Sequence, residues 1–332
     1  DTRSPEIDRL LADGDVEVRL ADGRRVLGER LEASGVEESA VLTGDVLLAT
    51  ANAVLDRASR IEIDEAGRIA RVVGGGRFRG LASETPLPDT DTRSNAEVIR
   101  TRAASAVQEL EAVWTDEATW AAADPADAAD ATDGPPDAGT LVLRGGVDAI
   151  AEPRLRERNR IRTAELTLVF AGDGDGESAA DAPPSGEFAA ADRRLARLIA
   201  RGDARLESRA WLREDRADLP RVLAIDGPSI DWDQRAGIAV VDGPGRLLVR
   251  DLREPEPRPG EADGPDEEDA LPATGFGPRG TSQFTWTGGL RLEPAEGLAA
   301  AGDADAGADT PADLLGTSRI TLRDDVEVLH QG

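Results

Sequence analysis

Residues 61–78 read Ile-Glu-Ile-Asp-Glu-Ala-Gly-Arg-Ile-Ala-Arg-Val-Val-Gly-Gly-Gly-Arg-Phe, and residues 230–247 read Ile-Asp-Trp-Asp-Gln-Arg-Ala-Gly-Ile-Ala-Val-Val-Asp-Gly-Pro-Gly-Arg-Leu. In our alignment Val72-Val73 is opposite Val240-Val241, and both stretches end in Gly-Arg-apolar. Apolar side chains at every second position share one face of a β-strand, and glycine-rich segments favour turns. The two stretches therefore predict a duplicated set of short strands.

The duplication continues beyond these stretches. Each copy is followed by a Trp-Thr pair, Trp114-Thr115 in the first and Trp286-Thr287 in the second, and then by an acidic insert and another strand. A fixed order of similar segments is the signature of tandem repeats. We therefore predict a first unit over 1–146, a second over 147–323, and the start of a third over 324–332.

A shorter pattern recurs five times within these units. Each instance joins a turn-forming pair to apolar residues at every second position, so we interpret the pair as the start of a strand. The instances are Gly14-Asp15-Val16-Glu17-Val18, Gly44-Asp45-Val46-Leu47-Leu48, Gly145-Gly146-Val147-Asp148-Ala149, Gly202-Asp203-Ala204-Arg205-Leu206 and Asp324-Asp325-Val326-Glu327-Val328. Likewise, Gly74-Gly75-Gly76 and Gly243-Pro244-Gly245 are predicted to be strand-to-strand turns.

Low-complexity inserts separate the strands. The segments rich in Ala, Asp, Gly, Glu and Pro are 122–139, 172–187, 253–280 and 294–315. Such segments bury too little apolar surface to offset the entropy of ordering, so we expect acidic disordered inserts.

Two short helices are expected among the strands. Ser94 and Glu97 form a capping-box pattern ahead of residues 96–110, inside an insert over about 80–112. A second short helix is expected over about 189–199, where apolar residues recur at helical spacing.

Composition excludes several classes of function. The 332 residues have a formal net charge of −27, all 39 basic side chains are Arg, and Lys, Cys, Met and Tyr are absent. Nucleic-acid binding needs basic patches, and no stretch supplies one. The chain has no disulfides, no Cys-ligated metal site and no run of about 20 apolar residues that would span a membrane. Because it begins at Asp1, we expect a processed or excised segment whose signal peptide has been removed.

Residues 14–78 resemble the OstA/LptA family of lipopolysaccharide-transport proteins. The family pattern is a Gly-x-Val-x-apolar strand, a turn, an apolar-acid-apolar strand and a second Gly-x-Val. Here it corresponds to Gly14–Val18, Arg30–Ala33, Ala40–Val46 and Arg60–Ile63. Residues 145–170 and 202–250 repeat the pattern less closely.

The resemblance implies an all-β fold, an open V-shaped β-jelly roll or β-solenoid of antiparallel strands in tandem repeats. It also implies a periplasmic, cell-envelope location and a groove that holds acyl chains. The implied partners are lipopolysaccharide or a similar amphiphile, and other envelope transport proteins or further copies stacked end to end.

The alternating aliphatic residues are the candidates for lining that groove. The predicted lipid-binding residues are Val16, Val18, Leu20, Leu42, Val46, Leu48, Ile61, Ile63, Leu166, Leu168, Ile230, Trp232, Val240, Leu247 and Val249. Apolar alternation reports burial alone, so for any single one of these residues we favour a place in a closed core over contact with a ligand.

Catalytic and metal sites are not predicted. The sole histidine, His330, lies two residues from the end of the sequence, and we interpret it as an exposed strand residue. Asp173–Glu177 lacks the full calcium-loop pattern, so no metal or cofactor is expected. Arg77 and Arg246 occupy matched positions, and we favour outward pairing with carboxylates over contact with a lipid phosphate.

We therefore predict a non-catalytic envelope protein that binds lipid and acts in lipopolysaccharide transport or outer-membrane assembly. One alternative is a structural envelope or surface β-solenoid without a lipid ligand. A more distant alternative is a carboxylate-dependent glycoside hydrolase, which needs a pair of carboxylates. With 66 acidic residues, the candidate pairs are too numerous to choose between.

Overall fold

The computed structural model describes residues 8–19, 25–50, 53–64, 66, 68–81, 99, 108–122, 137–152, 156–171, 194–211, 213, 215–252, 280–294 and 318–331. Apart from Ile99, which is helical, the regular elements in these ranges are β-strands, which confirms the predicted all-β class. They are β1 (Arg9–Arg19), β2 (Arg25–Ser34), β3 (Ser39–Ala49), β4 (Ala53–Asp64), β5 (Ile69–Val73), β6 (Gly76–Leu81), β7 (Gln108–Trp114), β8 (Glu117–Ala122), β9 (Asp137–Ala151), β10 (Glu157–Ala171), β11 (Arg194–Ala210), β12 (Arg221–Asp233), β13 (Ile238–Asp242), β14 (Gly245–Asp251), β15 (Gly280–Trp286), β16 (Gly289–Pro294), β17 (Ser318–Arg323) and β18 (Glu327–Gln331).

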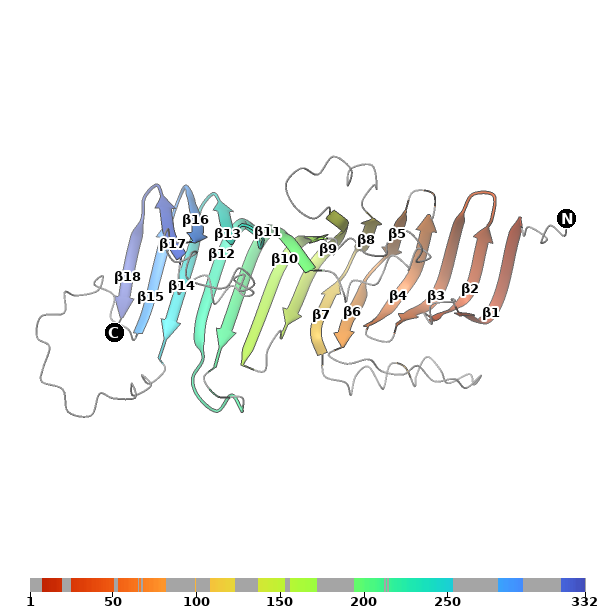
Figure 1. Cartoon of the computed structure of the whole chain (residues 1–332), viewed down its shortest axis with the longest axis horizontal. Coiled ribbons are helices and arrows are strands. Elements are labelled where there is room, and N and C mark those ends of the chain that lie inside the picture. Colours follow the sequence, from red (N-terminus) through yellow and green to blue (C-terminus); the bar gives the residue numbers. More distant parts are fainter. Residues whose placement is uncertain are drawn as a thin grey trace, which may run out of the picture.

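The strands form one antiparallel sheet that winds along the molecule as a meander. We call each passage of the chain across the full width of the sheet a rung. Some rungs are single long strands, such as β10. Others are two short strands in line, such as β5 and β6, which both pair with β4. Each rung pairs with the rung that follows it in the sequence, so β1 and β18 lie at opposite ends of an elongated molecule (Figure 1). No helix in the described ranges is long and apolar enough to span a membrane.

Every rung bends in its middle, and the glycine signals mark this bend. Gly14, Gly44, Gly145 and Gly202 all have positive φ angles and lie inside β1, β3, β9 and β11, not at the starts of these strands. The pairing register of β1 with β2 shifts at the same level, between Asp13 and Val16. The prediction that these glycines start strands was therefore wrong, because the φ > 0 that suits a turn also suits a bulge within a strand.

Gly74 and Gly243 also lie at the bend. They separate β5 from β6 and β13 from β14, and both have positive φ angles. The predicted turns at these two positions are thus bends in a rung, whereas the reversals of direction fall elsewhere, for example at residues 35–38 and 234–237.

The bend divides the sheet into two arms. Arm A comprises β5, β8, β13, β16 and β17 with residues 9–13, 30–34, 39–43, 60–64, 137–144, 165–171, 194–201 and 229–233. Arm B comprises β6, β7, β14, β15 and β18 with residues 16–19, 25–28, 46–49, 53–58, 147–151, 157–163, 204–210 and 221–227. One hydrophobic cluster takes residues from both arms, including Leu42 of arm A and Val46 of arm B. The two arms therefore enclose a shared interior.

The expected helix over 96–110 is helical at Ile99, but its last residues belong to β7. The described end of the second expected helix belongs to β11. β7 begins at Gln108 and β11 begins at Arg194, so residues 108–110 and 194–199 are extended and paired. The helical spacing over 195–199 was a chance pattern, because Leu195 and Ile199 occupy a strand whose neighbours β10 and β12 satisfy its backbone. The rest of both predicted helices, apart from Ile99, lies outside the described residues, as do the acidic inserts apart from their ends.

The two predicted repeat units share a set of contacts at the bend. The Trp114 indole N–H donates to the Gly74 carbonyl at 3.2 Å, and the Trp286 indole N–H donates to the Gly243 carbonyl at 3.0 Å. Each ring lies against a glycine of the paired strand, Gly76 or Gly245. Equivalent contacts in β5–β7 and β13–β15 are what a duplication produces, while the unit boundaries themselves stay a prediction.

The packing of Trp114 on Gly76 yields a prediction. A Cβ at Gly76 would lie within 3.0 Å of the Trp114 ring, so Gly76→Ala should lower the free energy of unfolding by about 1–3 kcal/mol through overpacking. Gly80→Ala in the same strand is the control, because its Cβ would meet nothing closer than 3.5 Å. Urea denaturation compares the two, and equal stabilities would contradict the packing described.

Candidate functional site

The interior face of arm A consists of two rows of apolar side chains that cross the whole sheet. The inner row, next to the bend, comprises Ala12, Leu31, Leu42, Ile61, Val72, Ala118, Leu143, Leu166, Ala200, Ile230, Val241, Leu290 and Leu322. The outer row comprises Leu10, Ala33, Ala40, Ile63, Ala70, Trp120, Leu141, Leu168, Leu198, Trp232, Ala239, Leu292 and Ile320. Neither row contains a polar residue, so arm A presents a continuous apolar wall.

The interior face of arm B is apolar near the bend and mixed farther out. Its apolar row comprises Val18, Val26, Leu48, Leu55, Phe78, Ala112, Ala149, Ile161, Leu206, Ile225, Leu247, Phe284 and Val328. The next row, called here the outer row of arm B, comprises Leu110, Ala151, Asn159, Ser208, Leu223, Val249, Ser282 and His330. In the rows described here, Asn, Ser and His side chains therefore occur only on arm B, whereas arm A carries no polar group other than the indole N–H of Trp120 and Trp232.

Burial is greatest near the bend. Val46, Ile230 and Leu247 each have an exposed fraction of 0%. Ile63 and Leu168, in the outer row of arm A, are only partly buried against the same cluster. The space next to the bend is thus a packed core, and parts of the outer rows are accessible to solvent.

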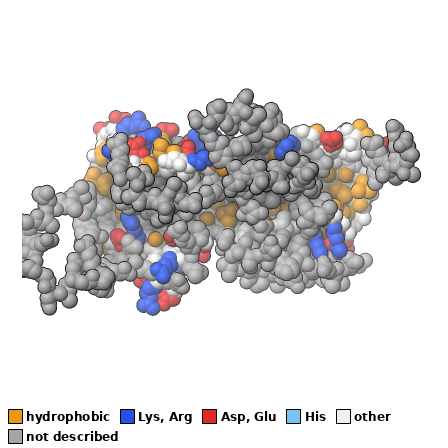
Figure 2. All heavy atoms as spheres, viewed as in Figure 1, with side chains coloured by type: hydrophobic (Ala, Val, Ile, Leu, Met, Phe, Trp, Pro, Cys, Tyr) orange, Lys and Arg blue, Asp and Glu red, His pale blue; other side chains and the backbone are white. Residues whose placement is uncertain are grey.

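The interior is open at its two ends. Leu10 on β1 and Val328 on β18 both have an exposed fraction of 45%, because they belong to the first and last rungs of the described sheet. Figure 2 shows apolar side chains at the surface of the end formed by β1. The apolar rows therefore run to both ends of the described sheet.

The structure brings most of the predicted groove residues together in this interior. Those on the interior face are Val16, Val18, Leu42, Val46, Leu48, Ile61, Ile63, Leu166, Leu168, Ile230, Trp232, Leu247 and Val249. Leu20 lies outside the described residues. Contact of any of these side chains with lipid stays a prediction.

Val240 is the exception, and its predicted placement on the inner face was wrong. It pairs with Asp231 and Arg291, which belong to the outer face, while Ala239 and Val241 on either side of it are buried in the core. The alignment of Val72-Val73 with Val240-Val241 was one residue out of register, because Val72 pairs with Ile61 as Val241 pairs with Ile230. A slip of one residue moves a side chain to the other face of a strand.

Sequence reasoning missed the interior polar residues Asn159 and Ser208. Asn159 occupies the same face of β10 as Ile161, and Ser208 the same face of β11 as Leu206. The Asn159 Oδ1 and Ser208 Oγ atoms are buried and have no hydrogen-bond partner in the described structure. Each such atom costs about 1–3 kcal/mol. A signal for them was present in the sequence. Asn159 stands two positions before Ile161, and Ser208 stands two positions after Leu206, so each continues the alternation of the apolar face.

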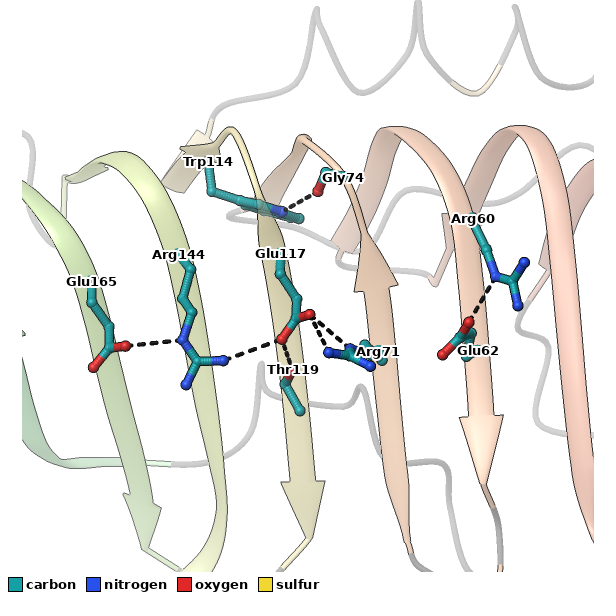
Figure 3. Close-up of polar contacts among 9 residues, drawn as sticks. All are labelled: Arg60, Glu62, Arg71, Gly74, Trp114, Glu117, Thr119, Arg144 and Glu165. Atoms are coloured by element: carbon teal, nitrogen blue, oxygen red, sulfur yellow. Dashed lines mark hydrogen bonds and ion pairs between the residues drawn. The ribbon is translucent and has the colours of Figure 1, made fainter.

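The outer face of arm A carries a chain of alternating charges. Arg71 pairs with Glu117 at 2.6 Å, Glu117 with Arg144 at 3.2 Å, and Arg144 with Glu165 at 2.9 Å, each across a strand boundary (Figure 3). The hydrogen bond to Glu165 raises the pKa of Arg144. These partly exposed pairs contribute little stability each, but they make the outer face polar where the inner face is apolar.

Arg77 and Arg246 also pair on the outer face, as we favoured. Arg77 donates two hydrogen bonds to Asp56, at 2.9 and 2.7 Å, and Arg246 donates to Asp226 at 3.0 Å from its Nε atom. The Asp56 site is buried: Asp56 has an exposed fraction of 0%, and Arg79, with 1%, donates to the same carboxylate at 2.7 Å. Burial raises the pKa of Asp56, but the hydrogen bond from Arg77 and the charge of Arg79 hold it below its usual value.

A second apolar cluster lies beside Asp56 on the outer face of arm B. Ile99, from the segment between β6 and β7, has an exposed fraction of 2% and packs with Leu47, Ala49 and Val54. The run Val46-Leu47-Leu48-Ala49 lacks polar alternation, which is typical of a strand buried on both faces. This part of arm B is therefore covered on its outside as well as its inside.

The buried Asp56 cluster yields the second prediction. Asp56→Asn removes the carboxylate and leaves the buried guanidinium of Arg79 and the partly buried one of Arg77 without it, so the free energy of unfolding should fall by about 3–5 kcal/mol at neutral pH. The folded-state pKa of Asp56 lies below its ordinary 3.8, so its stabilisation is complete above that pH and is lost as the pH falls below it. Chemical denaturation from pH 7 to pH 3 should therefore show the difference between the two proteins shrinking below about pH 4.

Asp226→Asn is the matched control for this experiment. Asp226 pairs with Arg246 at the equivalent position, but its side chain is 27% exposed, so the substitution should cost less than about 1 kcal/mol. Equal losses at the two sites would contradict the assigned burial of Asp56.

The remaining residues considered for catalysis or metal binding do not form a cluster. His330 is half-buried, not exposed as predicted, and its Nδ1 atom lies 2.9 Å from Ser282 Oγ in the outer row of arm B. Among the described residues, no group of three or more His, Cys, Asp and Glu side chains could hold a metal ion. Asp173–Glu177 lies outside the described residues.

Comparison with known proteins gives one structural likeness. The chain is similar to LptH of Pseudomonas aeruginosa, described as the LptA-homologous periplasmic component of the conserved lipopolysaccharide transport device. The TM-score is 0.26 and the sequence identity 16%, over 49% of this chain and 91% of LptH. No family model matches the chain, and no curated protein matches it. The proposals below rest on the geometry of the chain itself.

Proposed function

We propose that this chain is a non-catalytic carrier of amphiphiles, of the lipopolysaccharide-transport type, that holds acyl chains between its two arms. The observation that supports this function is the outer row of arm A, which is apolar at every rung from Leu10 to Ile320, both of them exposed. Each methylene that an acyl chain buries there contributes about 0.8 kcal/mol, so a few chains bind without polar recognition.

The burial pattern assigns different parts of the interior to different tasks. Residues next to the bend, such as Val46 and Leu247, hold the arms together, since they have no exposed surface. Ile63, Leu168 and Val249 are partly exposed and supply the surface for a ligand. An acyl chain would then lie along the outer rows, between the parts of the two arms that are farthest from the bend.

The two end strands suggest how the carrier is used. Within the described residues, β1 pairs only with β2 and β18 only with β15, and an unpaired strand edge is a template for a further strand. Copies of this chain, or other envelope transport proteins, would extend the apolar rows by pairing at these edges. The proposal includes a periplasmic location for the chain.

A structural β-solenoid without a lipid ligand is the second candidate. It is favoured by the complete burial of residues such as Val46, Ile230 and Leu290, which need no ligand to remove them from water. The two candidates differ in one respect: the outer rows bind the acyl chains of an amphiphile in the carrier, and bind none in the structural protein.

Native mass spectrometry with lipopolysaccharide separates them. Leu168→Asp places a charge in the outer row of arm A, so the lipid-bound fraction should fall about tenfold or more, because burying an uncompensated charge is costly. Val240→Asp is the matched control on the outer face of β13, where binding should stay unchanged. Thermal melting establishes that both variants are folded. If the unmodified protein retains no lipid, or Leu168→Asp retains as much, the structural candidate stands.

A further inference from the structure

Five residues form a patch on the outer face of arm B. Ala49, Val54 and Arg79 lie opposite one another on β3, β4 and β6, and their exposed fractions are 0%, 2% and 1%. Leu27 and Leu47 form the neighbouring pair on β2 and β3. An antiparallel sheet usually leaves one face to water, so burial of this face needs a covering group. We call these five residues the outer patch.

Ile99 covers the outer patch from a distant point of the chain. It lies in the connection between β6 and β7, has an exposed fraction of 2%, and packs with Leu47, Ala49 and Val54. β6 and β7 are paired neighbours that a short turn could join, yet Ile99 contacts β3 and β4 instead. The contact is therefore not a consequence of joining one strand to the next.

The second copy of this rung pair shows that the fold does not require the outer patch. In the matched row, Glu207, Ala224 and Leu248 lie opposite one another on β11, β12 and β14. Glu207 pairs with Arg205 at 3.5 Å and with Arg209 at 2.6 Å, and both Arg side chains are 45% exposed. The same bent sheet thus forms with solvated ion pairs where the first copy has an aliphatic surface.

Arg79 adds a hydrogen-bond donor to that aliphatic surface. Its Nη2 atom donates to Asp56 at 2.7 Å, whereas its Nε atom is buried without a hydrogen-bond partner in the described structure. Arg79 lies opposite Val54, which packs with Ile99, so an acceptor for the Nε atom would lie beside the Ile99 side chain. An unpaired buried donor costs about 1–3 kcal/mol, and a carbonyl or carboxylate at this place would remove that cost.

We infer that the outer patch is a docking site for a polypeptide segment that carries an aliphatic side chain and a hydrogen-bond acceptor. Its occupant is the segment of this chain around Ile99, bound within the same molecule. Ile99 fills the aliphatic part of the site and leaves the Arg79 donor unpaired, so the tethered segment uses only part of the site. A free copy of the segment is not held at β6 and β7 and can use both parts. The site is independent of what the interior binds.

A peptide of residues 94–104, Ser-Asn-Ala-Glu-Val-Ile-Arg-Thr-Arg-Ala-Ala, tests the inference by fluorescence anisotropy. Ile99→Ser vacates the outer patch, so this protein should bind the peptide saturably. The unmodified protein should bind it about tenfold more weakly, because its own Ile99 competes at a high effective concentration. A peptide with the same Ile99→Ser change is the control and should not bind.

Arg79→Leu in the vacated protein tests the donor. Leu248 occupies the matched position of the second copy, and Asp56 keeps its two hydrogen bonds from Arg77, so the sheet should still fold. Loss of one hydrogen bond to a charged group should weaken peptide binding about tenfold. Arg250→Leu, on the exposed outer face of β14, should leave peptide binding unchanged.

Thermal melting establishes that each variant is folded. The inference is overturned if the Ile99→Ser protein binds no peptide, if both peptides bind equally, or if the two proteins bind the peptide equally. Unchanged binding by the folded Arg79→Leu protein overturns the part assigned to Arg79. If Arg79→Leu does not fold, the two peptides still decide whether the outer patch is a docking site.

Discussion

The fold depends on all rungs of one long sheet bending at the same level. At this level the chain uses residues with positive φ, mostly glycine and aspartate, and the strand registers shift as in a bulge. Between Asp13 and Val16, for example, β1 uses one residue more than β2 opposite. Because neighbouring rungs absorb the bend together, apolar residues return to the interior face on both sides of it. The result is two arms that share one interior.

Apolar residues at every second position of the sequence were sufficient to predict much of this architecture. They placed Leu42, Ile61 and Leu166 on a common face, and the duplicated Trp-Thr pairs led to equivalent contacts at Gly74 and Gly243. The bend itself was not predicted, because a Gly-Asp pair supplies the positive φ angle that a turn and a bulge both require. The local sequence pattern could not distinguish a turn that reverses the chain from a bend within a strand.

The remaining errors have the same origin in local reasoning. Val240 was misplaced since Val240-Val241 offers two apolar residues in succession, and only pairing with Ile230 decides which one is buried. Residues 194–199 match a helical pattern, yet hydrogen bonding to two neighbouring strands determines their conformation. The interior position of Asn159 and Ser208 was missed because polar residues in a strand usually mark its solvent face.

Charge and apolar surface are separated between the two faces of the sheet. Arg and carboxylate side chains alternate across the outer face, from Arg71 to Glu165, and balance one another locally. The overall charge of −27 adds long-range repulsion between molecules. This repulsion opposes aggregation through the apolar ends.

The central claim, that acyl chains enter between the two arms, is tested most directly by a distance measurement across one rung. The chain has no native cysteine, so spin labels are placed uniquely at Val169→Cys and Arg158→Cys, on the outer faces of arm A and arm B of β10. Electron paramagnetic resonance should show this distance increasing when lipopolysaccharide is added. An unchanged distance with lipid bound would contradict the account.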